Sequence, residues 1–278
     1  MPTFIGVGAF GLVVLLFGLV VVAVLMIVTR VRPVDVDWVA GGYADPASRP
    51  VYETYLRRHW RARAAGGLAG LVVAVIAGYR WQGELWLSVG VGNGPISGDL
   101  LVGLLAGATI GTLGAETYRL RGRRGAKREA RLEARPPRPR PGLTWAARIL
   151  VVVCVVAAVV ALTVSGDQGP IAGAVLTVVI VALAEVTQIA ITDRPRFTDD
   201  LMDAVDHHLR IFSGTSVAWL EFSGAVLGFA WSLAGFDVPD GWSGLMVGVE
   251  LACLIVAFVA LWRSSGHAPR GWRAEVLA

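Results

Sequence analysis

Three glutamates stand inside long apolar stretches of this 278-residue chain: Glu185, Glu221 and Glu250. An ionised side chain at the centre of a membrane helix costs about 2.5 to 3.5 kcal/mol, so such acids face the interior of a helix bundle or carry a proton. Intramembrane acids are the usual means of binding cations or moving protons. We therefore expect a solute- or proton-binding site at these glutamates, together with Gln188, one turn beyond Glu185.

The same acids also have a purely structural interpretation. A neighbouring helix can satisfy a buried carboxylate with an arginine, and Arg63, Arg148 and Arg210 are suitably placed along the chain. Glu116, at the inner end of another apolar stretch, is expected to be mostly structural. Both interpretations stay open from the sequence.

Aspartates between two apolar stretches form a second group that could do chemistry. If a helix begins after Thr198, Asp199 and Asp203 lie on one face, where their oxygens could hold Mg²⁺. The run from Asp199 to Asp203 resembles the DDxxD motif of enzymes that use prenyl diphosphates, which implies Mg²⁺ and a lipid diphosphate. A second aspartate motif is absent, and acids in a first turn also simply favour the helix dipole.

Several enzyme classes lack their sequence motifs. There is no phosphate-binding glycine loop, no HExxH zinc pair and no GxSxG serine, and no lysine lies in an apolar stretch. Cys154 and Cys253 stand alone in apolar runs without metal-ligand spacing. We therefore expect no cofactor other than Mg²⁺, and the sequence favours a protein that is not an enzyme.

The elements that must position these residues are membrane helices. Hydrophobic residues make up 55% of the chain, charged residues 17%, and the mean hydropathy is +0.63. Apolar runs of about 20 residues are long enough to cross a bilayer. We predict one polytopic all-α membrane domain over residues 1–278, a bundle of seven helices. The predicted spans are 4–29, 64–81, 97–118, 144–164, 170–191, 215–235 and 244–262.

Basic residues predict the orientation of these spans. The connections after the first, third and fifth spans and the carboxyl-terminal tail each carry three or more basic residues, whereas the other connections carry one or none. By the positive-inside rule, the amino terminus lies outside and the carboxyl terminus in the cytoplasm of a cell membrane. Glu185 and Glu221 then lie about one-third of the way in from the cytoplasm and line an inward-opening polar vestibule.

Ribbons of small residues at intervals of four, which permit close helix contacts, occur in four spans. They begin at Gly66, Gly103, Gly224 and Gly244 and occupy the second, third, sixth and seventh spans. The first three and last three spans are therefore interpreted as parallel repeats joined by the fourth, an arrangement similar to that of SWEET-type sugar transporters. Coincidence within a glycine-rich bundle remains the alternative.

Two basic regions are expected at the cytoplasmic face. The stretch 46–63 is amphipathic and is predicted to lie on the inner leaflet, while 119–142 forms a basic loop. Anionic lipid or an acidic protein partner is expected to bind the arginines of both, whereas nucleic acid is not expected. These arginines are Arg57, Arg58, Arg61, Arg121, Arg123 and Arg124.

Three functions follow as hypotheses. The first is a permease-like transporter of a small solute or cation that uses the intramembrane glutamates. The second is a non-catalytic membrane subunit or scaffold that recruits a partner through the basic loop. The third is a magnesium-dependent enzyme that acts on a lipid diphosphate at Asp199 and Asp203.

Overall fold

Long helices dominate the computed structural model, which describes residues 30–82, 100–117, 128–129, 140–166, 168–193, 196–197, 200–236 and 240–272. The helices are α2 (Pro33–Val39), α3 (Arg49–Gln82), α4 (Leu100–Glu116), α5 (Pro141–Val160), α6 (Gly169–Thr192), α7 (Asp200–Ala234) and α8 (Ser243–Arg263). A π-helical turn, η1 (Ala161–Ser165), extends α5, and a 3-10 turn, η2 (Asp240–Trp242), precedes α8. The two-residue strands β1 (Arg128–Glu129) and β2 (Arg196–Phe197) pair antiparallel.

Five helices are long and apolar enough to cross a membrane. The segments are Arg49–Ala77, Pro141–Val164, Gly169–Thr192, Leu201–Ala234 and Ser243–Arg263. Helix α4, which matches the predicted span 97–118, is apolar but has only 17 residues. The predicted first span, 4–29, lies outside the described residues. The described helices therefore indicate an α-helical, multi-pass membrane protein.

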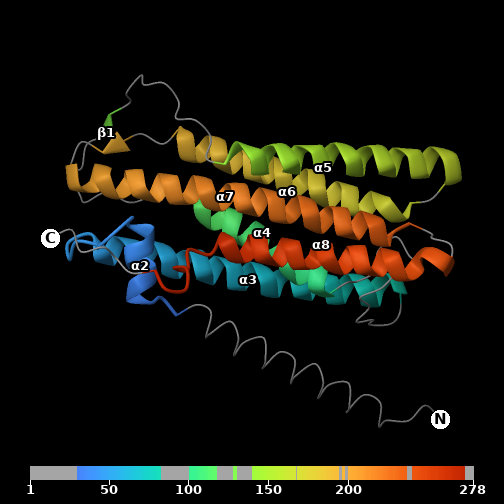
Figure 1. Ribbon diagram of the computed structural model, residues 1–278, viewed down its shortest axis with the longest axis horizontal. Helices are drawn as coiled ribbons and strands as arrows, with labels where there is room; N and C mark the ends of the chain where they lie inside the picture. The colour runs from blue at the N-terminus through green and yellow to red at the C-terminus, as the bar shows by residue number, and fades with distance from the viewer. Residues whose placement is uncertain are drawn as a thin grey trace, which may run out of the picture.

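Helix α7 lies at the centre of the bundle, in contact with α4, α5, α6 and α8 (Figure 1). Its Leu220 and Leu227 are fully buried and pack in one cluster with Ile180 of α6. By contrast, Val152 and Val156 of α5 are 61% and 55% exposed. Exposed valines in a row are expected where the outer face of a membrane helix meets lipid chains rather than water.

Glycines allow two pairs of helices to approach closely. A Cβ atom on Gly107 of α4 would lie 2.8 Å from the Cα of Gly70 on α3, and closer still to the carbonyl oxygen of Gly66. The glycines of α7 instead face α6, where a Cβ on Gly228 would meet the backbone of Gly173. In α8 no described residue lies within 4 Å of a Cβ added at Gly244 or Gly248. Three ribbons therefore make close helix contacts, whereas the fourth makes none with the helices that the structure describes.

The amphipathic stretch 46–63 was predicted to lie flat on the inner leaflet, and this prediction is wrong. It is the first half of α3, continuous with the membrane segment. At 1.5 Å per residue, the 34 residues of α3 extend about 50 Å, well beyond a bilayer core of about 30 Å. Tyr52, Leu56 and Trp60 form a buried cluster with Val205 and Leu209 of α7, which is also extended at this end. The aromatic face packs on protein instead of lipid because α7 supplies an apolar partner beside it.

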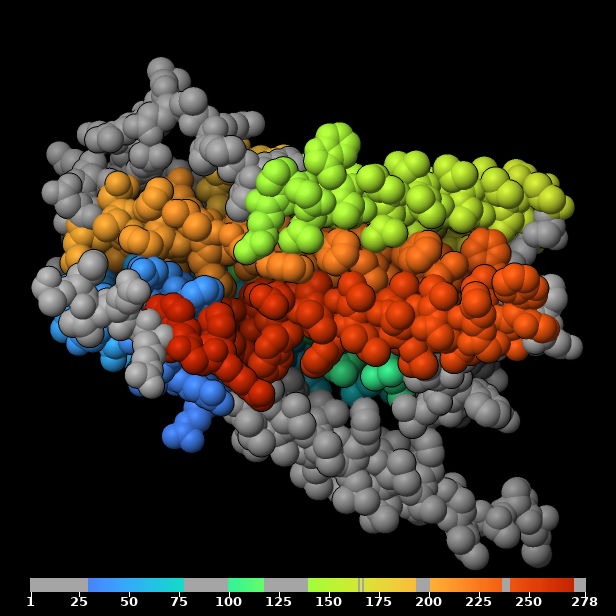
Figure 2. Space-filling model, viewed as in Figure 1, coloured from blue at the N-terminus to red at the C-terminus, as the bar shows by residue number. Residues whose placement is uncertain are grey.

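The segment after α8 turns back and covers the same end of the bundle. Figure 2 shows this segment, in red, lying against the blue α2. Trp60 donates a hydrogen bond from Nε1 to the carbonyl oxygen of Ser265 at 2.6 Å. His267 packs against Trp60 and Trp262, with ring centroids 4.4 and 5.1 Å apart. The backbone N–H of Ala268 donates to Asp35 of α2 at 3.0 Å. These contacts fix the tail to α2 and α3.

Candidate functional site

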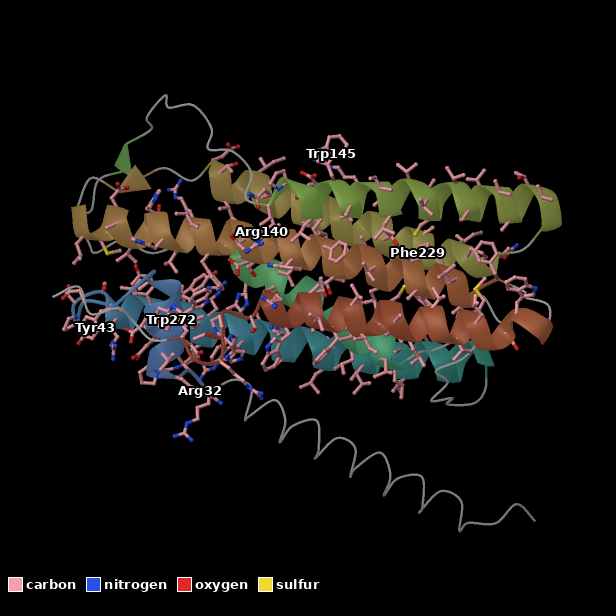
Figure 3. All side chains as sticks on the ribbon, viewed as in Figure 1. Arg32, Tyr43, Arg140, Trp145, Phe229 and Trp272 are labelled. Carbon is pink, nitrogen blue, oxygen red and sulfur yellow. The ribbon has the colours of Figure 1, made fainter. Side chains whose placement is uncertain are left out.

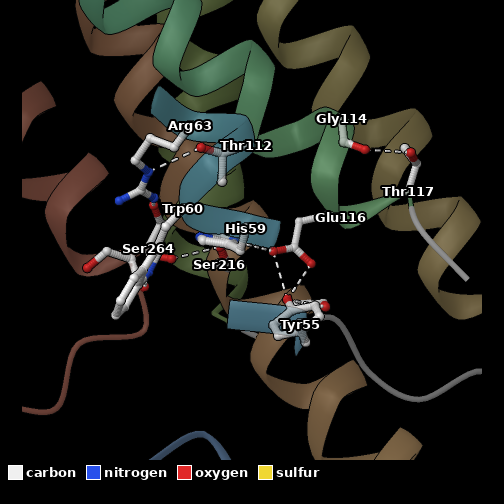
Figure 4. Close-up of polar contacts among 12 residues, drawn as sticks. Tyr55, His59, Trp60, Arg63, Thr112, Gly114, Glu116, Thr117, Ser216 and Ser264 are labelled. Atoms are coloured by element: carbon white, nitrogen blue, oxygen red, sulfur yellow. Dashed lines mark hydrogen bonds and ion pairs between the residues drawn. The ribbon is translucent and has the colours of Figure 1, made fainter. Parts of the chain in front are cut away.

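A buried polar cluster joins α3, α4 and α7 where the apolar helices end (Figure 4). Its centre is the carboxylate of Glu116 at the last residue of α4. Tyr55 donates from its hydroxyl to both carboxylate oxygens, at 2.8 and 2.6 Å, and His59 Nδ1 lies 2.6 Å from Oε1. The side chains of His59 and Glu116 are both 0% exposed. An acid–imidazole pair is therefore enclosed entirely by protein.

The cluster continues onto the central helix. Ser213 of α7 lies 3.0 Å from the Tyr55 hydroxyl, and it is also fully buried. His59, Glu116, Tyr55 and Ser213 thus form an unbroken chain of hydrogen-bonding groups, each of which can hold or pass a proton. The other ring nitrogen of His59, Nε2, is buried and has no hydrogen-bond partner of normal geometry in the part of the chain that the structure describes. The histidine thus presents a second nitrogen at the end of the chain.

Arg63 forms the adjoining layer, one turn further along α3. Its guanidinium donates from Nε to the hydroxyl of Thr112 at 3.2 Å and from Nη2 to the hydroxyl of Ser264 at 2.6 Å. Ser216 of α7 donates to the Ser264 carbonyl at 3.0 Å. A positive charge and three hydroxyl groups therefore connect α3, α4, α7 and the start of the tail.

Glu185 has the arginine partner that the structural interpretation predicts. Arg148 of α5 donates from Nε to Glu185 Oε1 at 3.0 Å and contacts the same oxygen through Nη2. The side chains are 42% exposed for Arg148 and 23% for Glu185, at the outside of the bundle. One turn away, Gln188 Oε1 is buried and has no hydrogen-bond partner among the described residues. The structure thus ties Glu185 to α5.

Glu221 and Glu250 lie deeper in the bundle and are only 3% and 4% exposed. Glu221 follows Ser213 by eight residues of α7, or about 12 Å of helix. Ser223 of α7 donates a hydrogen bond to the carbonyl of Ala257 on α8, so these two residues lie at the same level. Helix α8 runs antiparallel to α7, and Glu250 precedes Ala257 by seven residues. Glu250 therefore lies about 13 Å beyond Glu221 along the bundle axis. Buried acids occur at three depths, beginning with Glu116.

Glu185 and Glu221 lie at nearly the same level along the bundle axis. Thr177 of α6 lies beside Gly228 of α7 and Ile180 beside Gly224, so the antiparallel register brings residue 184 level with Glu221. Glu185 bonds to α5, whereas Glu221 is buried in the interior. The shared vestibule predicted for the two carboxylates stays a prediction.

The other predicted sites fall partly or wholly outside the described residues. Asp199, Arg121, Arg123 and Arg124 are outside, as is most of the basic loop. Asp203 is partly exposed, and within the described ranges no group of three His, Cys, Asp or Glu residues could hold a metal ion. The magnesium site therefore stays a prediction. Three arginines of the expected lipid-binding surface are exposed on α3, namely Arg57, Arg58 and Arg61.

The sequence indicated no partner for His59 and no more than a structural role for Glu116, so their pairing was not predicted. A signal was present, because Tyr55, His59 and Arg63 repeat at intervals of four and share one helix face. Nothing in the sequence showed that this face meets the end of α4. Comparison with models of known protein families, with curated proteins and with solved structures finds no match. The function of this protein is therefore inferred from the geometry of the site.

Proposed function

We propose that this protein is a permease-like membrane protein that moves protons, alone or together with a small solute or cation, through the interior of its bundle beside α7. The observation that carries the proposal is the buried hydrogen-bonded chain from His59 through Glu116 and Tyr55 to Ser213. Glu221 and Glu250 continue it at two deeper levels. The proposal includes water between these levels, since the steps of about 12 Å are too long for direct transfer.

Energetic cost favours a functional role for these acids. Removing a charge from water costs several kcal/mol per ion, and a buried pair is often no more stabilising than apolar residues of the same volume. Three enclosed acids at successive depths of one bundle are therefore an expensive way to hold helices together. Intramembrane acids arranged in this way are typical of proton and cation pathways. Relative to the sequence-based hypothesis, Glu116 and His59 join the pathway, and Glu185 becomes a structural partner of Arg148.

The topology is part of the same proposal. We place seven spans in a cell membrane, with the amino terminus outside and the end that carries α2 and the tail in the cytoplasm. The proposed parallel repeat matches α3 with α7. Their similar lengths of 34 and 35 residues, and the extension of both helices at the same end, support this match. Two other hypotheses, a scaffold subunit and a magnesium-dependent enzyme, stay alternatives. Both depend largely on residues outside the described ranges.

Proton flux into proteoliposomes tests the pathway by substitution. A potassium diffusion potential drives protons inward, and an enclosed pH-sensitive dye reports their entry. We expect Glu221→Gln to reduce the flux at least tenfold, because glutamine cannot release and rebind a proton. Glu185→Gln should retain most of the flux. Glu53→Gln, on the outward face of α3, removes the same charge away from the pathway and is the matched control. Equal flux in Glu221→Gln and Glu53→Gln would contradict the pathway.

A further inference from the structure

A cleft of about 960 Å³ opens at the same end of the bundle. Its walls come from α2, from one face of α7, from the tail after α8 and from Arg140, which immediately precedes α5. Figure 3 shows Arg140 at the start of α5 and Trp272 on the tail near α2. A volume of this size is in the range of small-molecule binding sites.

Positive charge dominates the lining. Five arginines line the cleft, namely Arg30, Arg32, Arg140, Arg263 and Arg270. None of these guanidinium groups forms an ion pair with a residue in the described ranges. Among the described residues of the lining, the single acid, Asp35, already accepts backbone hydrogen bonds from Ala268 and Arg32 and faces His267 at 3.5 Å. The cleft is therefore complementary to an anion.

The remaining wall is apolar and aromatic. Trp219 and Trp262 line the cleft, and the guanidinium of Arg140 lies 5.6 Å from the centre of the Trp219 ring. Arg140 is also the only non-glycine residue in the described ranges with a positive φ, at 53°. This left-handed conformation is uncommon for arginine, so the surrounding structure must stabilise the backbone of Arg140 beside the cleft.

The cleft lies at the level of lipid headgroups. Helix α5 begins at Pro141 and α8 ends at Arg263, so residues at these ends lie where the apolar segments stop. Tryptophan and arginine are typical of this boundary, with the rings toward the hydrocarbon and the charges toward the headgroups. A soluble anion would need the arginines but not the aromatic wall. The combination favours an amphiphile.

We propose that this cleft binds the phosphate headgroup of an anionic membrane lipid. The guanidinium groups bind the phosphate oxygens with paired N–H donors, the chemistry for which arginine is best suited. The aromatic wall contacts the glycerol and the first carbons of the lipid chains. This site is distinct from the exposed arginines of α3, which do not line the cleft. It also does not depend on proton movement beside α7.

A binding experiment with matched charge changes tests the proposal. The probe is dioctanoyl phosphatidic acid, titrated calorimetrically into the purified full-length chain in dodecyl maltoside. The cleft variant is Arg140→Gln/Arg263→Gln/Arg270→Gln, and the control, Arg57→Gln/Arg58→Gln/Arg61→Gln, removes the same charge from α3. An arginine near an anionic lipid contributes about fivefold in affinity, so the cleft variant should bind about a hundredfold more weakly. The control should change affinity less than threefold, because the exposed arginines of α3 are expected to respond to the charge of a bilayer surface, which a single short-chain lipid in detergent lacks.

Equal weakening by the two triple variants, or unchanged affinity in the cleft variant, would overturn the proposal. If the cleft triple is not recovered folded, the single variant Arg270→Gln, at an exposed residue, should still lose about fivefold, and no loss there would overturn it. Inorganic phosphate distinguishes the two sources of the anion. We expect it not to displace the lipid at millimolar concentration, whereas displacement would identify a soluble phosphate ligand and overturn the lipid assignment.

Discussion

At the level of single residues, the buried cluster depends on the Glu116 carboxylate, which contacts both the Tyr55 hydroxyl and the His59 ring of α3. Glu116→Gln keeps the shape but replaces one acceptor oxygen with an NH₂ group that faces the His59 ring or the Tyr55 hydroxyl. We expect the free energy of unfolding in mixed detergent to fall by about 2 kcal/mol.

A double-mutant cycle checks the cause of that loss. If the acid–imidazole contact is responsible, His59→Gln in the Glu116→Gln background should cost at least about 1 kcal/mol less than it costs alone, because the shared interaction is already gone. Strict additivity of the two substitutions would contradict a direct coupling between the residues.

Asp35 gives the docked tail a defined pH dependence. Burial alone would raise the pKa of this carboxyl, but the hydrogen bond with His267 and the backbone N–H groups of Ala268 and Arg32 outweigh burial and hold the pKa below its usual value of 3.8. Since the folded pKa is lowered, the stabilisation is fully present above the ordinary pKa and is lost as the pH falls below 3.8 through the lowered value.

Loss of this stabilisation should release the tail from α2. Cleavage after residue 263 by an acid-active protease, followed over a range of pH values, measures the release. The tail should resist cleavage at pH 6 and become sensitive below about pH 3.8. Asp35→Asn should be sensitive throughout, because an amide oxygen is a weaker hydrogen-bond acceptor than the carboxylate that contacts His267 and Ala268. A tail that stays equally protected in both proteins at every pH would contradict this role of Asp35.

At the level of elements, α3 and α4 are held together by backbone contact at glycines. Gly107→Ala places a methyl group against the α3 backbone, and overpacking of this kind costs about 1–3 kcal/mol. Gly248→Ala is the matched control, since none of the residues that the structure describes lies within 4 Å of its added methyl group. We expect loss of thermal stability in the first variant and no loss in the second. Equal effects would show that helix propensity, not close approach, decides the outcome.

Sequence patterns predicted helix positions well but not helix partners. The predicted spans at 144–164, 170–191 and 244–262 agree with α5, α6 and α8 to within a few residues, because apolar length alone determines a membrane segment. The extensions of α3 and α7 were not predicted as one continuous helix each, because hydropathy reports only the apolar half. The stretch 46–63 was correctly predicted to be amphipathic, yet the partner of its apolar face was taken to be lipid, since one sequence does not show which helices are neighbours.

The same limit applies to the candidate site. Glu221 and Glu250 were identified because an acid in an apolar run is visible in the sequence, and both are buried. The pairing of Glu116 with His59 was not predicted, because the two residues are 57 positions apart and meet only through helix packing.

At the level of the whole molecule, the proposed orientation places the basic end of the bundle in the cytoplasm. In a protein whose Cys154 and Cys253 are replaced by alanine, Gly241→Cys lies in the turn before α8, at the end opposite to the α3 extension. An impermeant thiol reagent should label this cysteine in intact cells, whereas Arg57→Cys should react only after permeabilisation. The reverse pattern would contradict the orientation.

The central claim is that protons cross this bundle by way of Glu221, and the most direct test is the proton flux of wild-type proteoliposomes compared with protein-free liposomes and with Glu221→Gln at equal protein content. The account predicts a flux in wild type that clearly exceeds that of protein-free liposomes and falls at least tenfold in the variant. A wild-type flux equal to that of protein-free liposomes, both with and without candidate solutes, or an undiminished flux in Glu221→Gln, would contradict it.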